Sequence, residues 1–442
     1  MMKVAKFGGT SMANASCIEK VKNVVFADQD IHYVVVSAPG KREKTDTKIT
    51  DLLYKCNDSI KYGQSVKEAF KPVADRFYTI IEELGIEFDI SGEINTIRKN
   101  ISEGASLDYI VSRGEYLSAK IAAAYFGWDF IDAIELVKFD EDGNFDAELT
   151  NKVTAKKLKG IKNAVIPGFY GVLPCGSVKT FSRGGSDISG AIIARAVNAD
   201  IYENWTDVDG FMKCDPRLVE NAELIDVLTY KELRELSYMG ANVLHPDSIF
   251  PVRKSDIPIN IKNTFNPSAK GTFIVPTTHF FDGKYKREDS IITGVAGKKD
   301  FIGIALEKSM MNNELGFGRR VLNVIEDNGL SFEHMPSGVD TLTVIVDGHK
   351  LSEELLKKVI FEIENVCEPD SIHVIRDLAL VAVVGHGMTS KSGTAYKVFE
   401  SLAKADINIK MIDQGSSELN IIIAIEGKDY EKAISALYNG LV

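Results

Sequence analysis

Short apolar stretches alternate with amphipathic ones along the first 290 residues. HYVVV is nearly continuous in apolar residues, a pattern typical of parallel strands buried on both faces, and VAKF and YENW are also predicted as strands. WDFIDA, NAVIPGFYG and IPINIKN are further strand candidates. SCIEKVKNVVFA, ITDLLYKC and most of residues 58–126 carry apolar residues three and four apart, as helices do. This alternation predicts an α/β/α sandwich, a three-layer α/β domain.

The last third of the chain repeats a different pattern. After the charged stretch KYKREDS, the order strand, helix, strand, strand, helix, strand predicts a ferredoxin-like βαββαβ unit at about 308–377. A second unit at about 378–442 lacks its last strand, which a strand from about 291–307 can supply. We therefore predict an N-terminal domain of 1–288 and a C-terminal region of 289–442 with two nested units.

Composition narrows the class of protein. The 442 residues exceed one ordinary core, and 45% hydrophobic with 26% charged residues is typical of globular proteins. No apolar run reaches the roughly 18 residues of a membrane span and the N-terminus lacks a signal-peptide core, so we expect a cytoplasmic protein. A net charge of −11 argues against nucleic acid as a partner. Five scattered cysteines without a CxxC pair argue against disulfides and structural zinc.

Two polar stretches carry the candidate chemistry. Lys6 ends the first strand and is followed by Gly8 and Gly9, where a lysine beside glycine N–H groups suits a transferring phosphoryl group. The alternative is a surface lysine at a tight turn. SRGGSD is predicted as a turn ahead of the helix SGAIIARAVN, whose start can bind an anion. There Arg183 offers a fork for a carboxylate and Asp187 suits Mg²⁺ or an ammonium group, the alternative being an ordinary helix cap.

A loop rich in Thr and Asp follows the strand YENW. Its side chains supply a hydroxyl, acids and a base at a strand end, which is where open α/β sheets bind ligands. The loop therefore favours nucleotide binding, through Thr206, Asp207, Asp209, Asp215 and Arg217.

Six motifs in one order resemble the monofunctional aspartokinases: KFGGTS at 6–11, SRGE at 112–115, SRGGSD at 182–187, WTDVDG at 205–210, DPR at 215–217 and VLHP at 243–246. The resemblance implies the amino-acid-kinase fold and the ATP-dependent phosphorylation of L-aspartate to 4-phospho-L-aspartate, the first step towards lysine, threonine and methionine. The C-terminal units resemble paired ACT domains, which sense amino acids. A carboxylic acid of pKa about 4 is ionised at pH 7, so this reaction needs no general base.

The resemblance also implies roles for individual residues. It gives catalytic roles to Lys6, Arg183 and Asp187. For the aspartate contacts it implies Ser37, Thr50, Glu115, Arg183 and Ser186. For the ATP contacts it implies Lys6, Phe7, Gly8, Gly9, Thr206, Asp207, Met212, Arg217, Asn242 and Val243. Met212 stands where the family has a tyrosine and Asn242 where it has a lysine. Mg²⁺ is expected to be held mainly by ATP, with no metal site on the protein itself.

The ACT resemblance implies control by an amino acid. The effector contacts expected at a helix start and on the next strand are Asn313, Gly316, Phe317, Gly318, Ser331 and Glu333. Glu333 favours a cation, so lysine is the expected inhibitor, with threonine as the alternative or co-effector. A homodimer through the ACT domains, and possibly a tetramer, is expected. Two alternative functions stay open, namely a sister amino-acid or nucleotide kinase and a non-catalytic ATP-binding sensor. For the ACT units, the alternative is that they serve only as a dimer interface.

Overall fold

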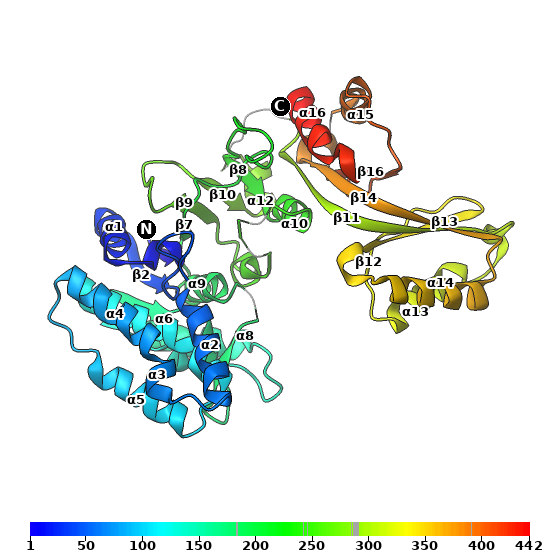
Figure 1. The fold of residues 1–442 in the computed structure, drawn as a ribbon. Coiled ribbons are helices and arrows are strands. Elements are labelled where there is room, and N and C mark those ends of the chain that lie inside the picture. The colour runs from blue at the N-terminus through cyan, green and yellow to red at the C-terminus, as the bar shows by residue number, and fades with distance from the viewer. Residues whose placement is uncertain (183, 242, 245, 284, 286–290, 390) are drawn as a thin grey trace. The chain divides into compact units, whose positions relative to one another are not determined.

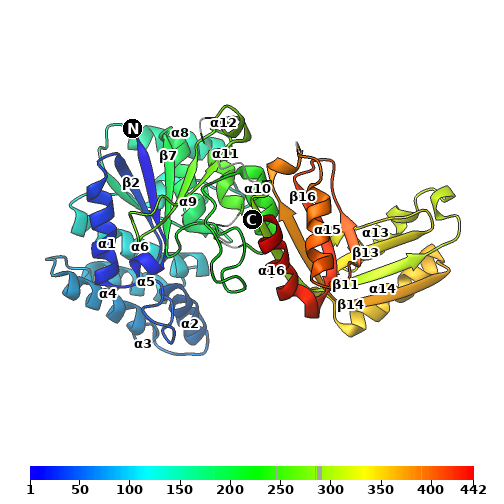
Figure 2. The same cartoon turned by 90° about the horizontal axis from the view of Figure 1, so that it is seen from above.

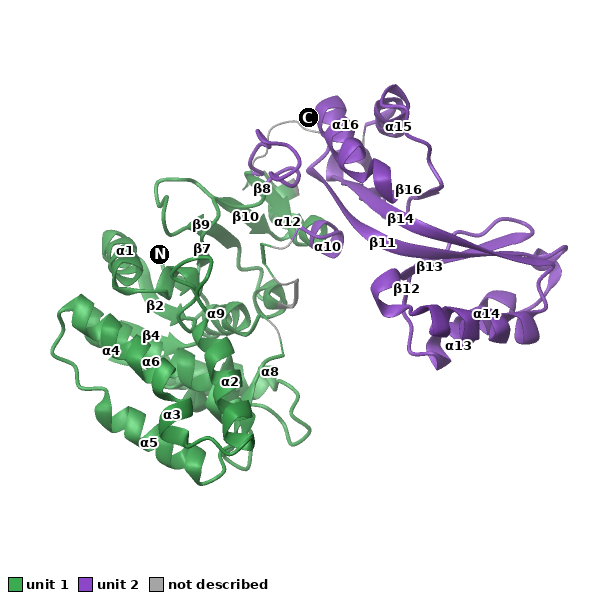
Figure 3. Cartoon of the chain, viewed as in Figure 1, with its two compact units in different colours: residues 1–211, 226–233, 242–286 green, residues 212–225, 234–241, 287–442 purple. Residues whose placement is uncertain are grey.

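The structure is a computed structural model that describes residues 1–182, 184–241, 243–244, 246–283, 285, 291–389 and 391–442. Its residues group into two compact units (Figure 3). The N-terminal unit comprises 1–211, 226–233 and 242–286, and the C-terminal unit comprises 212–225, 234–241 and 287–442. Within the described ranges, no helix is both long and apolar enough to cross a membrane.

An eight-stranded sheet runs through the N-terminal unit in the order β3-β4-β2-β1-β7-β9-β10-β8 (Figure 1). The strands are β1 (Lys3–Phe7), β2 (Ile31–Val36), β3 (Asp129–Phe130), β4 (Ala164–Pro167), β7 (Ile201–Thr206), β8 (Val227–Thr229), β9 (Ile259–Asn263) and β10 (Thr272–Val275). The first six strands in this order are parallel, while β10 runs antiparallel to β9. The carboxyl ends of β1, β2, β4, β7 and β9 therefore meet at one edge of the sheet.

Helices cover both faces of this sheet, as the alternation in the sequence predicts. The helices of residues 1–286 are α1 (Ala15–Ala27), α2 (Ile49–Lys61), α3 (Val66–Ala69), α4 (Lys71–Leu84), α5 (Ser91–Ser102), α6 (Leu107–Phe126), α7 (Ala133–Leu136), α8 (Ala147–Leu158), α9 (Gly185–Ala196), α10 (Tyr230–Tyr238), α11 (Phe250–Arg253) and α12 (Thr277–Phe281), and α10 begins in the N-terminal unit and ends in the C-terminal unit. A small hairpin joins β5 (Tyr170–Val172) to β6 (Val178–Thr180).

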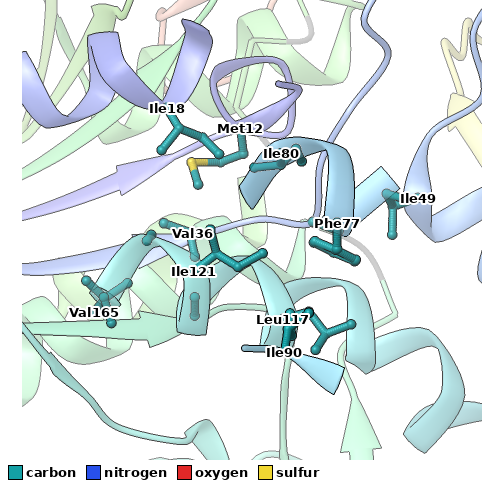
Figure 4. Close-up of a cluster of buried hydrophobic side chains, with 14 of the residues drawn as sticks. Met12, Ile18, Val36, Ile49, Phe77, Ile80, Ile90, Leu117, Ile121 and Val165 are labelled. Carbon is teal, nitrogen blue, oxygen red and sulfur yellow. The ribbon is translucent and has the colours of Figure 1, made fainter. Parts of the chain in front are cut away.

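The main core lies between the sheet and the helices α1, α2, α4, α5 and α6. Figure 4 shows ten labelled members of this cluster: Met12, Ile18, Val36, Ile49, Phe77, Ile80, Ile90, Leu117, Ile121 and Val165. Ala5 and Phe7 of β1 belong to it, whereas Lys6 between them faces α9 and pairs with Asp187. Because side chains alternate along a strand, one face of β1 builds the core and the other reaches the site.

Two boundaries in this unit differ from the sequence prediction. Helix α9 begins at Gly185, so Ser186 and Asp187 form its first turn and do not lie in a loop ahead of it. Gly184 is the cap, in the left-handed conformation at φ 58° that glycine adopts easily. The strand predicted at WDFIDA is only two residues long, because Asp132 caps α7 and accepts a hydrogen bond from the Ile134 N–H at 3.2 Å.

The C-terminal unit contains a six-stranded antiparallel sheet in the order β12-β13-β11-β14-β16-β15. The strands are β11 (Gly294–Glu307), β12 (Phe332–His334), β13 (Thr341–Asp347), β14 (Ser371–Val384), β15 (Met411–Asp413) and β16 (Asn420–Glu426). The helices are α13 (Phe317–Asp327), α14 (Glu353–Cys367), α15 (Thr394–Lys404) and α16 (Tyr430–Leu441). Each half has the ferredoxin-like strand arrangement, which confirms the predicted fold class.

Strands β11 and β14 are shared by the two halves. The strand predicted at about 291–307 corresponds to β11, whereas the predicted boundary between residues 377 and 378 falls inside β14. Both are 14 residues long and bend near their middles, where Asp300 and Asp377 have positive φ angles of 69° and 54°. Val374 packs into the core under α13 and α14, while Val381 packs into the core under α15 and α16. The two helix pairs therefore cover opposite faces of one continuous sheet (Figure 1, and turned in Figure 2).

Candidate active site

An ion pair joins the end of β1 to the first turn of α9. The Lys6 Nζ lies 2.6 Å from the Asp187 Oδ1, and Lys6 is only 7% exposed. The Asn204 side-chain amide on β7 donates to the same carboxylate oxygen at 2.9 Å, and the Tyr202 hydroxyl donates to the Asp187 carbonyl at 3.0 Å. Three elements thus hold one buried ammonium group at the carboxyl edge of the sheet.

The glycine loop after β1 packs against the loop after β2. The Gly8 N–H donates to the Trp205 carbonyl at 3.0 Å, and the Gly40 N–H donates to the Gly9 carbonyl at 2.8 Å. A Cβ on Gly40 would lie 2.7 Å from the Gly9 carbonyl carbon, closer than real Cβ contacts come. The backbone of Ser37 joins this arrangement, because its N–H donates to the Phe7 carbonyl at 3.1 Å.

Asp207 follows β7 and faces the same loop. The Thr10 hydroxyl donates to its Oδ2 at 3.1 Å and the Thr206 hydroxyl to its Oδ1 at 3.2 Å. The Asp207 carboxylate is exposed. Because Thr10 directly follows the glycines of the loop after β1, its hydrogen bond to Asp207 brings the candidate nucleotide residues of β1 and β7 together.

Glu115 is buried on α6, close to the backbone of Ala38. It is 5% exposed, and this burial raises the pKa of its carboxyl to about 8, against a smaller lowering by the Ala38 N–H. Its Oε2 has no hydrogen-bond partner among the described residues. The neighbouring Gly114 allows the close packing, because a Cβ there would lie 2.8 Å from the Ala38 Cβ. A buried carboxyl with a free oxygen is suited to bind a ligand cation.

Ion pairs hold the loop that leads from Gly40 to Thr50 of α2. Asp46 lies between Arg42 and Arg76, with N–O distances of 2.9 and 2.8 Å. Hydrogen bonding to Arg42, opposed by burial, keeps the pKa of Asp46 well below its usual range. The buried Arg76 also donates to the Gly40 carbonyl at 3.3 Å. This network positions both the close packing at Gly40 and the start of α2, where Thr50 is half-buried.

The start of α9 packs against the chain leaving β4. A Cβ on Gly168 would lie 2.8 Å from the Ser186 Cα, and one on Gly185 would lie 2.6 Å from the Phe169 ring. Phe169 has a positive φ of 80°, and its N–H donates to the Ser189 hydroxyl at 3.0 Å. This packing brings Ser186 to the site edge.

The sequence prediction misses Asn204, Gly168 and Phe169. Asn204 was detectable as a polar residue inside the apolar strand YENW, and Gly168 as the first glycine of GFYG after β4. The contact between Phe169 and Gly185 has no local signal, since it joins segments far apart in the sequence.

The remaining candidates are distributed as follows. Arg183 and Asn242 lie outside the described residues. Val243 belongs to the N-terminal unit and is half-buried. Met212 and Arg217 belong to the C-terminal unit, where the Arg217 Nη2 lies 2.6 Å from the Asp215 Oδ2.

The effector candidates surround the start of α13 and the strand β12. Phe317 is buried in the core, so only its backbone is available to a ligand, and Gly316 caps the helix at φ 78°. Asn313 and Ser331 are exposed and Gly318 is half-buried, with Gly318 in the first turn of α13. The Glu333 Oε2 accepts a hydrogen bond from the Tyr238 hydroxyl.

Carboxylates at the site edge occur singly. The described part of the chain contains no group of three or more acidic, histidine or cysteine side chains that could hold a metal ion. Asp187 is engaged by Lys6 and Asn204, and Asp207 by two hydroxyl groups. This donor set fits an ion that brings most of its ligands with it, such as one bound to a polyphosphate.

Fold and site together define an amino-acid kinase with an ACT region. The family model "Amino acid kinase family" matches residues 1–263, and the model "ACT domain" matches residues 381–441. Aspartokinase 3 of Bacillus subtilis is 38% identical over 99% of this chain and 98% of its own length. The chain belongs to the aspartokinase family and is an aspartate kinase.

Solved structures agree over the full length. The crystal structure of Clostridium acetobutylicum aspartate kinase, described as an allosteric enzyme, has a TM-score of 0.94 and 49% identity and covers 100% of both chains. Escherichia coli aspartokinase III in complex with aspartate and ADP has a TM-score of 0.76 and 25% identity, again with 100% of both chains covered. The same enzyme is also known in complex with lysine and aspartate in a T-state, with a TM-score of 0.76.

Proposed function

We propose that the enzyme transfers the γ-phosphoryl group of ATP to the side-chain carboxylate of L-aspartate, forming 4-phospho-L-aspartate for the lysine, threonine and methionine pathway. The observation that carries this proposal is the buried Lys6 ammonium between β1, β7 and the first turn of α9. The E. coli relative bound to aspartate and ADP supports both substrates.

In this proposal Lys6 stabilises the charge on the transferring phosphoryl oxygens. Asp187 and Asn204 fix the ammonium group before the substrates arrive, so no reorganisation is needed during transfer. The acceptor carboxylate is ionised at neutral pH and attacks without a general base. Catalysis then rests on positioning and charge neutralisation, as is usual in phosphoryl transfer. Mg²⁺ brought in by ATP would supply further neutralisation, and Asp187 and Asp207 are the carboxylates that would contact it.

The aspartate ligand is held by its two α-substituents. We assign its ammonium group to Glu115, whose Oε2 has no partner among the described residues. We assign its α-carboxylate to Arg183, whose planar guanidinium can bind it with two hydrogen bonds. Ser37, Thr50 and Ser186 assist. The nucleotide contacts are assigned to Lys6, Phe7, Gly8, Gly9, Thr206, Asp207, Met212, Arg217, Asn242 and Val243.

A coupled assay for ADP release tests this function and separates it from its rivals. Release that depends on L-aspartate, and that is at least tenfold slower with L-glutamate or with no acceptor, supports the aspartate reaction. A rate that is equal with glutamate would favour a sister kinase. ATP binding without any ADP release would favour the non-catalytic sensor.

For regulation, we propose that lysine binds at the start of α13 and on β12 and inhibits the enzyme, with threonine as alternative or co-effector. The N–H groups at the helix start suit the effector carboxylate. An effector ammonium group would replace the Tyr238 hydroxyl as the donor to Glu333. The lysine complex of the E. coli relative supports this choice. The active form is proposed to be a homodimer through the ACT regions, or a tetramer.

A further inference from the structure

A pocket of about 590 Å³ lies in the N-terminal unit, on α6 but away from the face that carries Glu115. It is bounded by the end of α5, the loop before α6, the start of α7 and the β5–β6 hairpin. The lining residues that matter here are Asn100, Ser106, Tyr109, Arg113, Ile134 and Ser177. Pockets of roughly 300–1,000 Å³ are the size that binds small metabolites.

Arg113 is the buried charged group of this pocket. It is 5% exposed and forms no ion pair within the described part of the chain. Its Nε donates to the Tyr109 carbonyl at 3.2 Å, and its Nη2 donates to the Ser112 hydroxyl at 2.9 Å. Its Nη1 has no hydrogen-bond partner among the residues described. A guanidinium stays charged at any physiological pH, so a buried one requires compensation.

Three tyrosine rings surround the guanidinium. Its central carbon lies 4.4, 4.6 and 5.2 Å from the ring centroids of Tyr109, Tyr116 and Tyr170. The nearby acids are engaged by other groups, because the Tyr116 hydroxyl donates to Glu93 and the Tyr170 hydroxyl donates to Asp132, each at 2.8 Å. Cation–π contacts compensate the charge only in part.

Further hydrogen-bond donors face the same space. The Tyr109 hydroxyl accepts from the Asn100 amide at 2.7 Å, which leaves its own proton free to donate. The Ser106 oxygen accepts from the Tyr109 N–H at 3.2 Å, which likewise leaves the hydroxyl proton free. Glu103 also lines the pocket and is exposed, and its charge opposes a dianion such as phosphate. Ile134 and Val178 add apolar surface.

We propose that this pocket binds a small organic carboxylate, with its carboxylate group on Arg113 and its remainder against the apolar wall. The site is separate from the proposed aspartate site, because residues two apart on a helix point about 200° apart around its axis. Arg113 and Glu115 therefore lie on opposite sides of α6.

Isothermal titration calorimetry and ligand-observed NMR on the full chain test this proposal, with glycolate, L-alanine and inorganic phosphate as probes and with ADP present to fill the nucleotide site. We expect glycolate or L-alanine to bind more tightly than phosphate. Arg113→Lys should weaken this binding at least tenfold, because an ammonium group cannot reproduce the planar fork.

A second variant tests the same pocket without altering Arg113, in case Arg113→Lys fails to fold. Ile134→Trp fills the pocket from its half-exposed wall and leaves Arg113 in place. We expect it to abolish probe binding while kcat and the melting temperature stay at wild-type values. The proposal is overturned if the wild-type chain binds neither carboxylate probe, if phosphate binds more tightly than both, or if Ile134→Trp leaves the binding unchanged.

Discussion

The raised pKa of Glu115 predicts how aspartate binding depends on pH. With a pKa of about 8 in the free enzyme, about one-tenth of the carboxyl groups are ionised at pH 7 and about one-hundredth at pH 6. If only the ionised form accepts the substrate ammonium group, the KM for aspartate falls about ninefold from pH 6 to pH 7 and about fivefold from pH 7 to pH 8. The kcat at saturating aspartate stays constant over this range, since it reports the bound complex.

Steady-state kinetics between pH 6 and pH 8 measure this effect, and calorimetry gives an independent check. At pH 7, binding should release about 0.9 proton per site, which appears as a dependence of the binding enthalpy on the ionisation enthalpy of the buffer. Glu115→Gln is the control, because it should bind aspartate weakly and with no proton release. A KM that changes less than twofold between pH 6 and pH 7 would refute the contact or the burial argument.

The same carboxyl group should reduce the stability of the free enzyme. Its folded pKa lies above the unfolded value of 4.5, so stability is intact below pH 4.5 and is lost as pH rises towards about 8. The loss at pH 7 is about 3 kcal/mol, against under about 1 kcal/mol at pH 5. Glu115→Gln should therefore raise the urea midpoint at pH 7 and change it little at pH 5. If Glu115→Gln shifts the urea midpoint by the same amount at pH 5 and at pH 7, this account is wrong.

Three further predictions concern transfer, substrate binding and control. Lys6→Ala should lower kcat on the order of 10²-fold or more, while its KM for aspartate stays within a few-fold of the wild-type value. Lys3→Ala on the same strand is the control and should keep the wild-type kcat. A near-normal kcat in Lys6→Ala would exclude the proposed role of Lys6. Arg183→Lys should lower kcat/KM for aspartate about tenfold, and an unchanged value would exclude Arg183 from the site. Glu333→Gln should raise the lysine concentration for half-inhibition and Tyr238→Phe should lower it, whereas a wild-type rate unaffected by millimolar lysine, threonine and their mixture would refute sensing.

The fold class was predictable because its signals are local. The apolar stretches of β1, β2 and β7 and the helical periodicity around α6 determine which faces must be buried. The continuity of β14 was not predictable in the same way, because the polar residues 376–377 resemble a loop in sequence. In the structure Asp377 adopts a positive φ angle and the strand continues past it. Short polar residues tolerate this conformation better than branched ones.

The site was predictable only where a motif marks it. Lys6, Asp187 and Asp207 lie in short glycine-rich or acidic stretches, and the structure gathers them at one sheet edge. Asn204 and Phe169 contribute through contacts between segments far apart in the sequence, namely β7 with α9 and the end of β4 with Gly185. Such contacts depend on the register of the packed elements, which hydrophobic periodicity does not specify.

Lys6 and Glu115 are both buried ionisable groups, but among the described residues only Lys6 has a partner of opposite charge at hydrogen-bond distance. The buried Lys6 ammonium group is paired with the Asp187 carboxylate at 2.6 Å, so this part of the site is formed before any substrate binds. Burial leaves Glu115 unstable as an anion because its Oε2 has no partner in the described chain. Lys6 therefore has its partner before a ligand arrives, whereas the Glu115 Oε2, unpartnered within the described residues, gains a partner only from a ligand. Glu115 therefore suits selection of the substrate cation, and Lys6 suits the transfer step.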